Sequence, residues 1–315
     1  MINFRYHVVS LTAVFLALAI GLVVGTAALN GPLSDNLHAD VNALRKQNQQ
    51  YRDQVNHLNE ETNRQEQFAT ETAPYVLANK LTGHRVLVLS MQSGTKYVDD
   101  VVKNLQLAGA KITRRVEIQD KFFDPASTDE LLDIASYSRP PSVAHLPTNS
   151  NGVETSTALL AAVLMDGAPS IPDDARRTVL TAYTSQHQYV ILTGQVTGPA
   201  EAVVFVAGSP YVDRDAAKKN AAVVTMVAGL DQAGPIVVAG AGAGGDGNVL
   251  AQVRGDPALT KTVSTVDNVS TSQGRVTTAL ALAEQIGEHT GHYGVDAGAG
   301  SLVPRSPAEG TRSGP

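Results

Sequence analysis

Two histidines near the C-terminus come nearest, by type and spacing, to a metal-ligand pair. His289 and His292 lie three residues apart in the run HTGHY. Two imidazoles at that spacing could begin a zinc or copper site. A complete site needs further ligands, and the nearest carboxylates are Glu288 and Asp296. His289 and His292 are therefore metal candidates only, and we favour a polar surface or a hydrogen-bonded corner.

Ligands for monovalent copper are missing from the sequence in their usual form. Such a site uses Cys and Met, ideally in closely spaced pairs. The chain has no cysteine, and its four methionines are isolated from one another, at Met1, Met91, Met165 and Met226. The lack of cysteine also excludes disulfides and cysteine nucleophiles. We expect no resident cofactor, with copper left as an alternative.

A glycine-rich run offers the spacing of a nucleotide-binding loop. Gly240, Gly242 and Gly245 form GxGxxG after the apolar run 236–239. In a dinucleotide fold this loop must open a helix. The segment that follows, 249–253, has the pattern of a strand, so we predict a connection between two strands.

Enzyme signatures are otherwise absent from the sequence. It contains no GxSxG, no HExxH and no paired-carboxylate motif. We therefore predict a protein that is not an enzyme. An envelope enzyme with an unrecognised site stays as an alternative.

The N-terminal segment predicts a membrane anchor. Residues 8–29 carry no charge, and about 20 apolar residues suffice to span a bilayer. Arg5 precedes this segment, and the first basic residue after it is Arg45. The positive-inside rule then places residues 1–7 in the cytoplasm and the bulk of the chain outside. We predict a single-pass protein of the plasma membrane.

A cleaved signal peptide is the competing interpretation of this segment. Small residues at 25–28 could form a cleavage site, and release would carry the chain to the outer membrane. The apolar stretch is longer than the roughly 7–15 residues of a signal core. We therefore favour the uncleaved anchor.

Small residues recur along one face of the anchor. They are spaced by four, at Ala13, Ala17, Gly21 and Gly25. Such a stripe lets two helix backbones approach closely, although glycine and alanine are common in any membrane helix.

The segment after the anchor predicts a coiled-coil stalk over residues 33–73. Apolar residues alternate at spacings of four and three, with a polar Asn48 among them: Leu37, Val41, Leu44, Asn48, Tyr51, Val55 and Leu58. Valine at position a with leucine at d, and a buried asparagine at a, favours a parallel dimer. A single amphipathic helix packed on the next domain is the alternative.

The limits of the stalk are set by prolines. Gly31-Pro32 is expected to break the helix between anchor and stalk, and Pro74 to end it. The seam weakens after Leu58, where Thr62, Gln65, Ala69 and Thr72 follow. A stalk of 40 helical residues would hold the next domain up to ~60 Å from the membrane.

Residues 80–295 predict an α/β domain with a mainly parallel sheet. Expected strands are 85–90, 112–118, 189–192, 202–206, 236–239, 249–253 and 262–266. Expected helices are 98–107, 155–165, 175–184, 216–230 and 275–286. Alternation of short apolar runs with helical segments is typical of layered α/β folds. Residues 139–152 are expected to form a loop and 296–315 a disordered tail. The formal net charge of −6, without long charge runs, argues against a nucleic-acid surface.

The two ends of the chain resemble a known family. The N-terminal FRYHVVSLTAVFLALAIGLVVG and the C-terminal STVDNVSTSQGRVTTALALAEQ and GHYG are similar to the mycobacterial copper transport protein B (MctB) family. This resemblance implies an actinobacterial envelope protein. It supplies no catalytic residues.

The resemblance implies two different functions. One is copper efflux, copper homeostasis or an outer-membrane pore. The other follows SteB-like members, which work beside a SteA-like membrane protein and the coiled-coil region of a peptidoglycan hydrolase during cell separation. An anchor, a coiled coil and a rigid distal domain favour a dimeric scaffold or regulator of septal peptidoglycan hydrolysis.

Overall fold

The structure is a computed structural model that describes residues 4–167, 170–185, 188–194 and 198–305. The side chains of residues 28–36 lie outside this description. The chain divides into two compact units, residues 1–65 and 66–315. The α/β unit thus begins at Glu66, well before the predicted residue 80.

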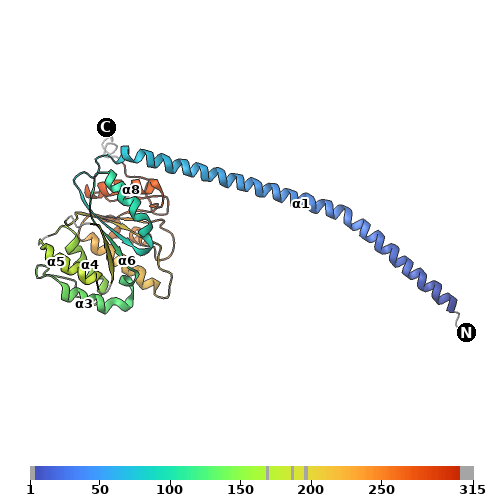
Figure 1. The fold of residues 1–315 in the computed structure, drawn as a ribbon, viewed down its shortest axis with the longest axis horizontal. Helices are drawn as coiled ribbons and strands as arrows, with labels where there is room; N and C mark the ends of the chain where they lie inside the picture. Colours follow the sequence, from blue (N-terminus) through green and yellow to red (C-terminus); the bar gives the residue numbers. More distant parts are fainter. Residues whose placement is uncertain (1–3, 168–169, 186–187, 195–197, 306–315) are drawn as a thin grey trace. The chain divides into compact units, whose positions relative to one another are not determined.

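The first unit lies within one long helix, α1 (Phe4–Leu77), shown in blue in Figure 1. Its segment Phe4–Ala27 is long and apolar enough to cross a membrane. The predicted break at Gly31-Pro32 is wrong, since the helix continues through both residues. A proline removes one backbone donor, and a helix with good residues on both sides can bend there and continue.

The helix also passes Pro74, which we predicted as its end, and stops at Leu77. Its last turns are held by the α/β unit, because Ala73, Leu77 and Leu81 are buried in one of that unit's cores. Tertiary packing here outweighs the loss of one hydrogen bond.

The second unit is built on a seven-stranded sheet with the order β3-β2-β1-β4-β5-β6-β7. Its strands are β1 (Arg85–Met91), β2 (Lys111–Ile118), β3 (Val190–Thr193), β4 (Ala202–Val206), β5 (Ile236–Ala239), β6 (Ser264–Val266) and β7 (His292–Tyr293). Only β3, which lies at an edge, pairs antiparallel among the described strands. The predicted α/β class with a mainly parallel sheet is confirmed.

Helices cover both faces of the sheet (Figure 1). They are α2 (Val98–Leu107), α3 (Thr128–Ser138), α4 (Gly152–Leu164), α5 (Asp173–Thr184), α6 (Ala216–Asp231), α7 (Val249–Gly255) and α8 (Ser272–Ile286). Short 3₁₀ turns are η1 (Gln92–Tyr97), η2 (Asp120–Phe123), η3 (Pro125–Ser127) and η4 (Leu259–Lys261).

Alternate residues of β1, β4 and β5 point into two separate cores. In β1, Leu87 and Leu89 enter the core that α3 to α7 share, whereas Val86 and Val88 face α2, α8 and the end of α1. A strand that is buried on both faces has a continuous run of apolar residues in the sequence. Strands β1, β4 and β5 were therefore easy to predict.

The structure corrects one predicted element and adds two others. The expected strand 249–253 is helix α7, while helix α3 and strand β7 were not predicted. The predicted disordered tail is ordered as far as residue 305, because Ser301 bridges to Tyr293 and the Gly300 N–H donates to the His292 carbonyl. Residues 306–315 lie outside the described residues.

Candidate functional site

An apolar stripe lies open along the stalk part of α1. The side chains of Leu44, Tyr51 and Leu58 are 63%, 57% and 59% exposed in the single chain. Leu37, Val41, Asn48 and Val55 of the predicted seam are exposed too. Large apolar side chains repeated on one helix face are costly to leave in water, so this stripe is a candidate interaction surface.

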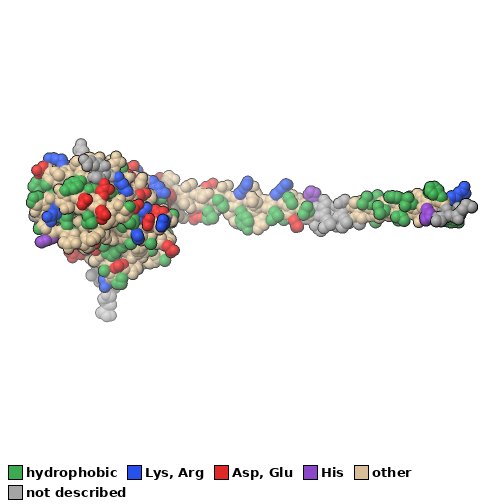
Figure 2. Space-filling model, turned by 90° about the horizontal axis from the view of Figure 1, so that it is seen from below, with side chains coloured by type: hydrophobic (Ala, Val, Ile, Leu, Met, Phe, Trp, Pro, Cys, Tyr) green, Lys and Arg blue, Asp and Glu red, His purple; other side chains and the backbone are tan. Residues whose placement is uncertain are grey.

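The anchor segment carries apolar side chains on all its faces. Figure 2 shows green side chains interspersed with tan along the segment, basic and His colours at its N-terminal end, and both basic and acidic colours along the helix on the other side of the undescribed stretch. Nothing lies within 4 Å of a Cβ atom built on Gly21 or Gly25. The predicted stripe of Ala13, Ala17, Gly21 and Gly25 is therefore accessible to a partner helix.

The last turns of α1 pack on the α/β unit instead of staying open. Ala69, which we placed in the coiled-coil seam, is buried. Glu66 accepts a hydrogen bond of 2.7 Å from the Ser272 N–H, and its carboxylate lies 3.7 Å from Arg275. Thr70 and Ser272 join their hydroxyls at 3.0 Å. This region therefore follows our alternative of an amphipathic helix packed on the next domain.

The two candidate metal ligands do not converge. The Nδ1 atom of His292 lies 2.9 Å from the Thr265 hydroxyl, and its Nε2 atom lies 2.9 Å from the Thr260 hydroxyl. His289 is exposed, with Nδ1 2.7 Å from the Gly287 carbonyl. Burial lowers the pKa of His292 below its ordinary value. Within the described residues no three His, Asp or Glu side chains gather as a metal site.

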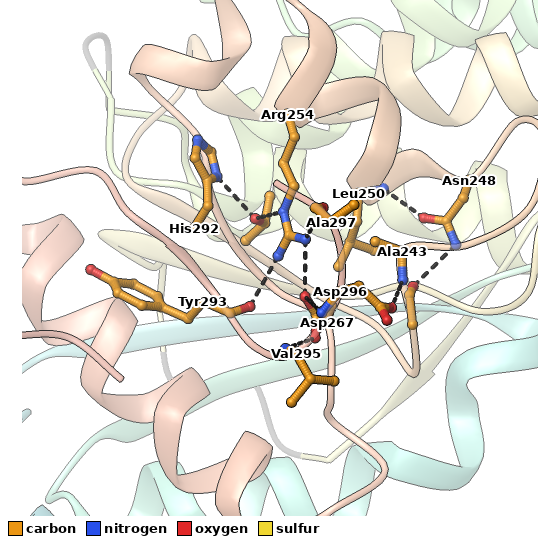
Figure 3. A network of polar contacts seen from close by, with 12 residues as sticks. Ala243, Asn248, Leu250, Arg254, Asp267, His292, Tyr293, Val295, Asp296 and Ala297 are labelled. Carbon is orange, nitrogen blue, oxygen red and sulfur yellow. Dashed lines mark hydrogen bonds and ion pairs between the residues drawn. The ribbon is translucent and has the colours of Figure 1, made fainter. Parts of the chain in front are cut away.

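A buried ion pair lies beside His292 at the carboxyl ends of β6 and β7 (Figure 3). The side chains of Arg254 and Asp267 are 5% and 0% exposed and meet at 2.9 Å. The Asp267 carboxylate also accepts hydrogen bonds from the N–H groups of Val295, at 2.8 Å, and Asp296, at 3.1 Å. Every polar atom of this carboxylate is therefore used to hold the segment after β7.

The Arg254 guanidinium completes the same network with three oxygen acceptors besides Asp267. It donates to the Thr265 hydroxyl at 2.9 Å and to the carbonyls of Tyr293 and Ala297 at 3.0 Å each. A buried charge that is paired and hydrogen-bonded in this way has a structural role. The network fastens residues 295–297, at the start of the predicted tail.

The glycine-rich loop does open a helix, contrary to our prediction. The Asn248 side chain caps α7 by accepting from the Leu250 N–H at 2.9 Å, and it donates to the carbonyls of Gly242 and Gly244 at 3.1 Å each. The Ala243 N–H donates to the Asp296 carboxylate at 2.6 Å. One backbone N–H of the loop is thus already bonded to a carboxylate of the same chain.

A cleft of about 130 Å³ lies at the carboxyl ends of β1, β4 and β5. It is lined by three adjacent loops, with the residues Ser93, Lys96, Tyr97, Gly208, Ser209, Pro210, Ala241, Gly242, Gly244 and Asn248. In open α/β sheets, ligands bind in such crevices, where the strand order reverses.

Sequence reasoning found the glycine loop but missed its neighbours in the cleft. Ser93, Lys96 and Ser209 belong to no recognisable sequence motif. They line one cleft because β1 and β4 are adjacent in the sheet. The signals available were a glycine two or three residues after each strand, at Gly94 and Gly208.

Known proteins match this chain over almost its whole length. Residues 1–304 match the family model described as "Copper transport outer membrane protein, MctB". The chain is 30% identical to "Copper transporter MctB" of Mycobacterium tuberculosis, covering 96% of this chain and 99% of the relative. It is 32% identical to the protein of the same name from Mycobacterium leprae, with the same coverage.

The match takes in the apolar helix, the rest of α1 and the α/β unit together. The apolar helix fits a single-pass membrane anchor, and the family description is that of an envelope protein. The chain belongs to the MctB family.

Proposed function

We propose that this protein is a membrane-anchored, non-enzymatic scaffold of the cell envelope that acts as a parallel homodimer. The observation that carries this proposal is the open stripe on α1 from Leu37 to Leu58. A parallel two-stranded coiled coil would bury the whole stripe, and it would place Asn48 opposite its own copy.

The remainder of the molecule suits such a scaffold. The last turns of α1 are fastened to the α/β unit by Glu66 and by the burial of Ala73 and Leu77. Pairing of two α1 helices would therefore bring two α/β units together. The polar network around Arg254 and Asp267 serves the rigidity of that unit.

The proposed place of action is the septal cell wall. There the protein would work beside a SteA-like membrane protein and engage the coiled-coil region of a peptidoglycan hydrolase. The seam weakens at Thr62, where a partner helix could enter. The proposed topology is a cytoplasmic N-terminus, an uncleaved anchor in the plasma membrane and an extracytoplasmic α/β unit.

Disulfide crosslinking tests the dimer directly, because the chain has no cysteine of its own. Leu44→Cys and Leu58→Cys place one thiol at seam position d. Asp53→Cys places it at position f on the outer face and is the matched control. In membranes carrying the full-length chain, mild oxidation should crosslink both seam variants and leave the control monomeric, because disulfides need Cα atoms about 4.4–6.8 Å apart.

The pattern of crosslinking distinguishes a specific coiled-coil seam from random collision between chains. Equal crosslinking at all three positions, or none at any, would show that the stripe does not pair with a second copy. A photoreactive residue at Thr62 tests the partner: capture of the hydrolase supports the septal role, and self-crosslinks alone contradict it.

Copper transport is the second candidate, favoured by the name of the relatives. The side chains of Met91, Met165 and Met226 are at most 2% exposed, so these three thioethers are withdrawn into the core. If this chain handles copper directly, the purified full-length protein should retain Cu(I) against a chelator, and His289→Ala should release it. Retention of one Cu(I) per chain would favour this candidate over the scaffold.

A further inference from the structure

The cleft at the carboxyl ends of β1, β4 and β5 lies where the chain reverses direction in the sheet. From β1 the chain builds outward to β2, and from β4 it builds the other way to β5. The helix after β1, α2, contributes to one core, and the helix after β4, α6, contributes to the other. The two connections therefore leave toward opposite faces and open a crevice between them.

Two glycines allow these connections to approach each other below the cleft. A Cβ atom on Gly94 would lie 2.6 Å from the Val206 carbonyl oxygen, and one on Gly208 would lie 1.7 Å from the Ser93 hydroxyl. Neither distance is possible for a real side chain. The first turn after β1 and the loop after β4 are thus built to lie against each other, which sets the position of the Ser93 hydroxyl.

The third side of the cleft is the glycine-rich loop, and its shape is fixed from within. Asn248 is buried and holds the carbonyls of Gly242 and Gly244. These two carbonyls are turned toward the asparagine. The Asn248 side chain therefore braces this loop from within.

The lining combines one cation with hydroxyl groups. Lys96 is the one charged side chain among the described residues that line the cleft, and Ser93, Tyr97 and Ser209 supply hydroxyls. The Lys96 ammonium lies 4.9 Å from the centre of the Tyr97 ring, which favours a position over the ring.

Two acidic side chains on α2 near the cleft are already paired with arginines. Asp99 on α2 lies 2.7 Å from Arg115, and Asp100 lies 2.9 Å from Arg275. These arginines balance the charges of Asp99 and Asp100. The Asp296 carboxylate beside the glycine-rich loop accepts the Ala243 N–H, and Lys96 is the cation among the described residues that line the cleft.

Size restricts what the cleft can hold. A volume of about 130 Å³ corresponds to about four water molecules at ~30 Å³ each. Drug-sized ligands need roughly 300–1,000 Å³. A single oxyanion fits, with the remainder of its carrier outside the cleft. A dinucleotide does not fit, and the Asp296 carboxylate already takes the Ala243 amide.

We propose that this cleft binds the phosphate group of a small phosphorylated compound through Lys96, Ser93 and Ser209. A lysine ammonium beside hydroxyl donors is a common set for phosphate recognition. This site is independent of the proposed scaffold role, since it uses none of the α1 stripe.

Calorimetry on the full-length chain in detergent tests the proposal with three probes. They are inorganic phosphate, glycerol 3-phosphate and glycerol, titrated at constant ionic strength. Glycerol 3-phosphate should bind and glycerol should not. Inorganic phosphate binding as tightly as the ester would assign the site to free phosphate, whereas weaker binding would assign it to an organic phosphate.

Matched variants locate the binding. Lys96→Gln should weaken glycerol 3-phosphate binding at least tenfold, and Ala241→Phe, which fills the cleft and keeps the charge, should abolish it. Lys103→Gln, which changes an exposed lysine on the following helix α2, should change nothing. Thermal unfolding of each variant checks that it is folded.

Three results would overturn the proposal. The first is no heat from either phosphate compound up to millimolar concentration. The second is equal weakening by Lys96→Gln and Lys103→Gln, which would mean diffuse attraction to surface charge. The third is full binding by a folded Ala241→Phe variant, which would place the anion elsewhere.

Discussion

The carboxylate of Glu66 accepts a hydrogen bond of 2.7 Å from the backbone N–H of Ser272, so a side chain of α1 closes the first turn of α8. The first N–H groups of a helix lack partners within the helix. Thr271 satisfies one of them by accepting from Gly274, and Glu66 satisfies another with a negative charge, which the helix dipole favours. This contact joins the long helix to the α/β unit.

We expect Glu66→Gln to loosen that junction. The amide keeps the shape but loses the charge and the 3.7 Å pair with Arg275. Because such caps contribute about 0.5–2 kcal/mol, the α/β unit should lose about 1 kcal/mol of unfolding free energy. Amide exchange should speed up at Ser272 and in the first turn of α8. Glu71→Gln, an exposed carboxylate on the same helix, is the control and should change neither measurement.

The sequence predicted best those elements whose pattern is local. Strands β4 and β5 and helix α2 have the predicted limits. Each is a short apolar run or an amphipathic segment that needs no knowledge of its neighbours. The order of the strands was not predictable, because it depends on which runs pair across the sheet.

The errors have physical causes too. The run VLAQV at 249–253 is apolar enough for a strand, and only the Asn248 cap turns it into a helix. Strand β7 has two residues, too few for any periodicity. Residues 295–297, at the start of the predicted tail, are fastened by Arg254 and Asp267, which are distant in sequence, so the glycine-rich composition was misleading.

We expect Arg254→Met to be among the most destabilising substitutions in the α/β unit. It would leave the Asp267 carboxylate buried and without its cation. Breaking one side of such a buried pair costs about 3–5 kcal/mol. Urea unfolding of the variant should show this loss, and Arg177→Met on the exposed face of α5 should stay within about 0.5 kcal/mol of the parent.

The double variant Arg254→Met with Asp267→Asn separates the ion pair from packing. If the cost comes from an unpaired charge, the double variant should be more stable than Arg254→Met alone, because the two effects are coupled. Additive losses would mean that the two side chains contribute independently, Asp267 by accepting the N–H groups of Val295 and Asp296.

We expect Asn48→Val to strengthen pairing of α1 while weakening its specificity. A polar residue at position a fixes register and dimer state at a cost in stability. In detergent, the variant should dimerise about tenfold more tightly, which is about 1.4 kcal/mol, and should also populate larger oligomers. Analytical ultracentrifugation measures both, with Asp53→Val on the outer face as the control. Weaker association of the Asn48→Val variant would count against a seam at this position.

We expect the α/β unit to lose stability as the pH falls from about 7 to 5, in part through His292. Burial lowers the pKa of this imidazole below its ordinary value of 6.5. The unfolded chain therefore binds the proton more readily than the folded chain does, and stability rises with pH. The contribution of His292 is fully present above pH 6.5 and is lost as the pH falls through the range below it. Denaturant midpoints between pH 5 and 8 measure this dependence.

The variant His292→Gln should flatten that dependence. It removes the titrating ring, so the difference between the midpoints at pH 8 and pH 5.5 should be smaller than in the parent, even though the variant is less stable at both. His145→Asn removes an exposed histidine and should leave the difference unchanged. An unchanged difference in His292→Gln would assign the acid sensitivity to carboxylates instead, since these also gain protons as the pH falls.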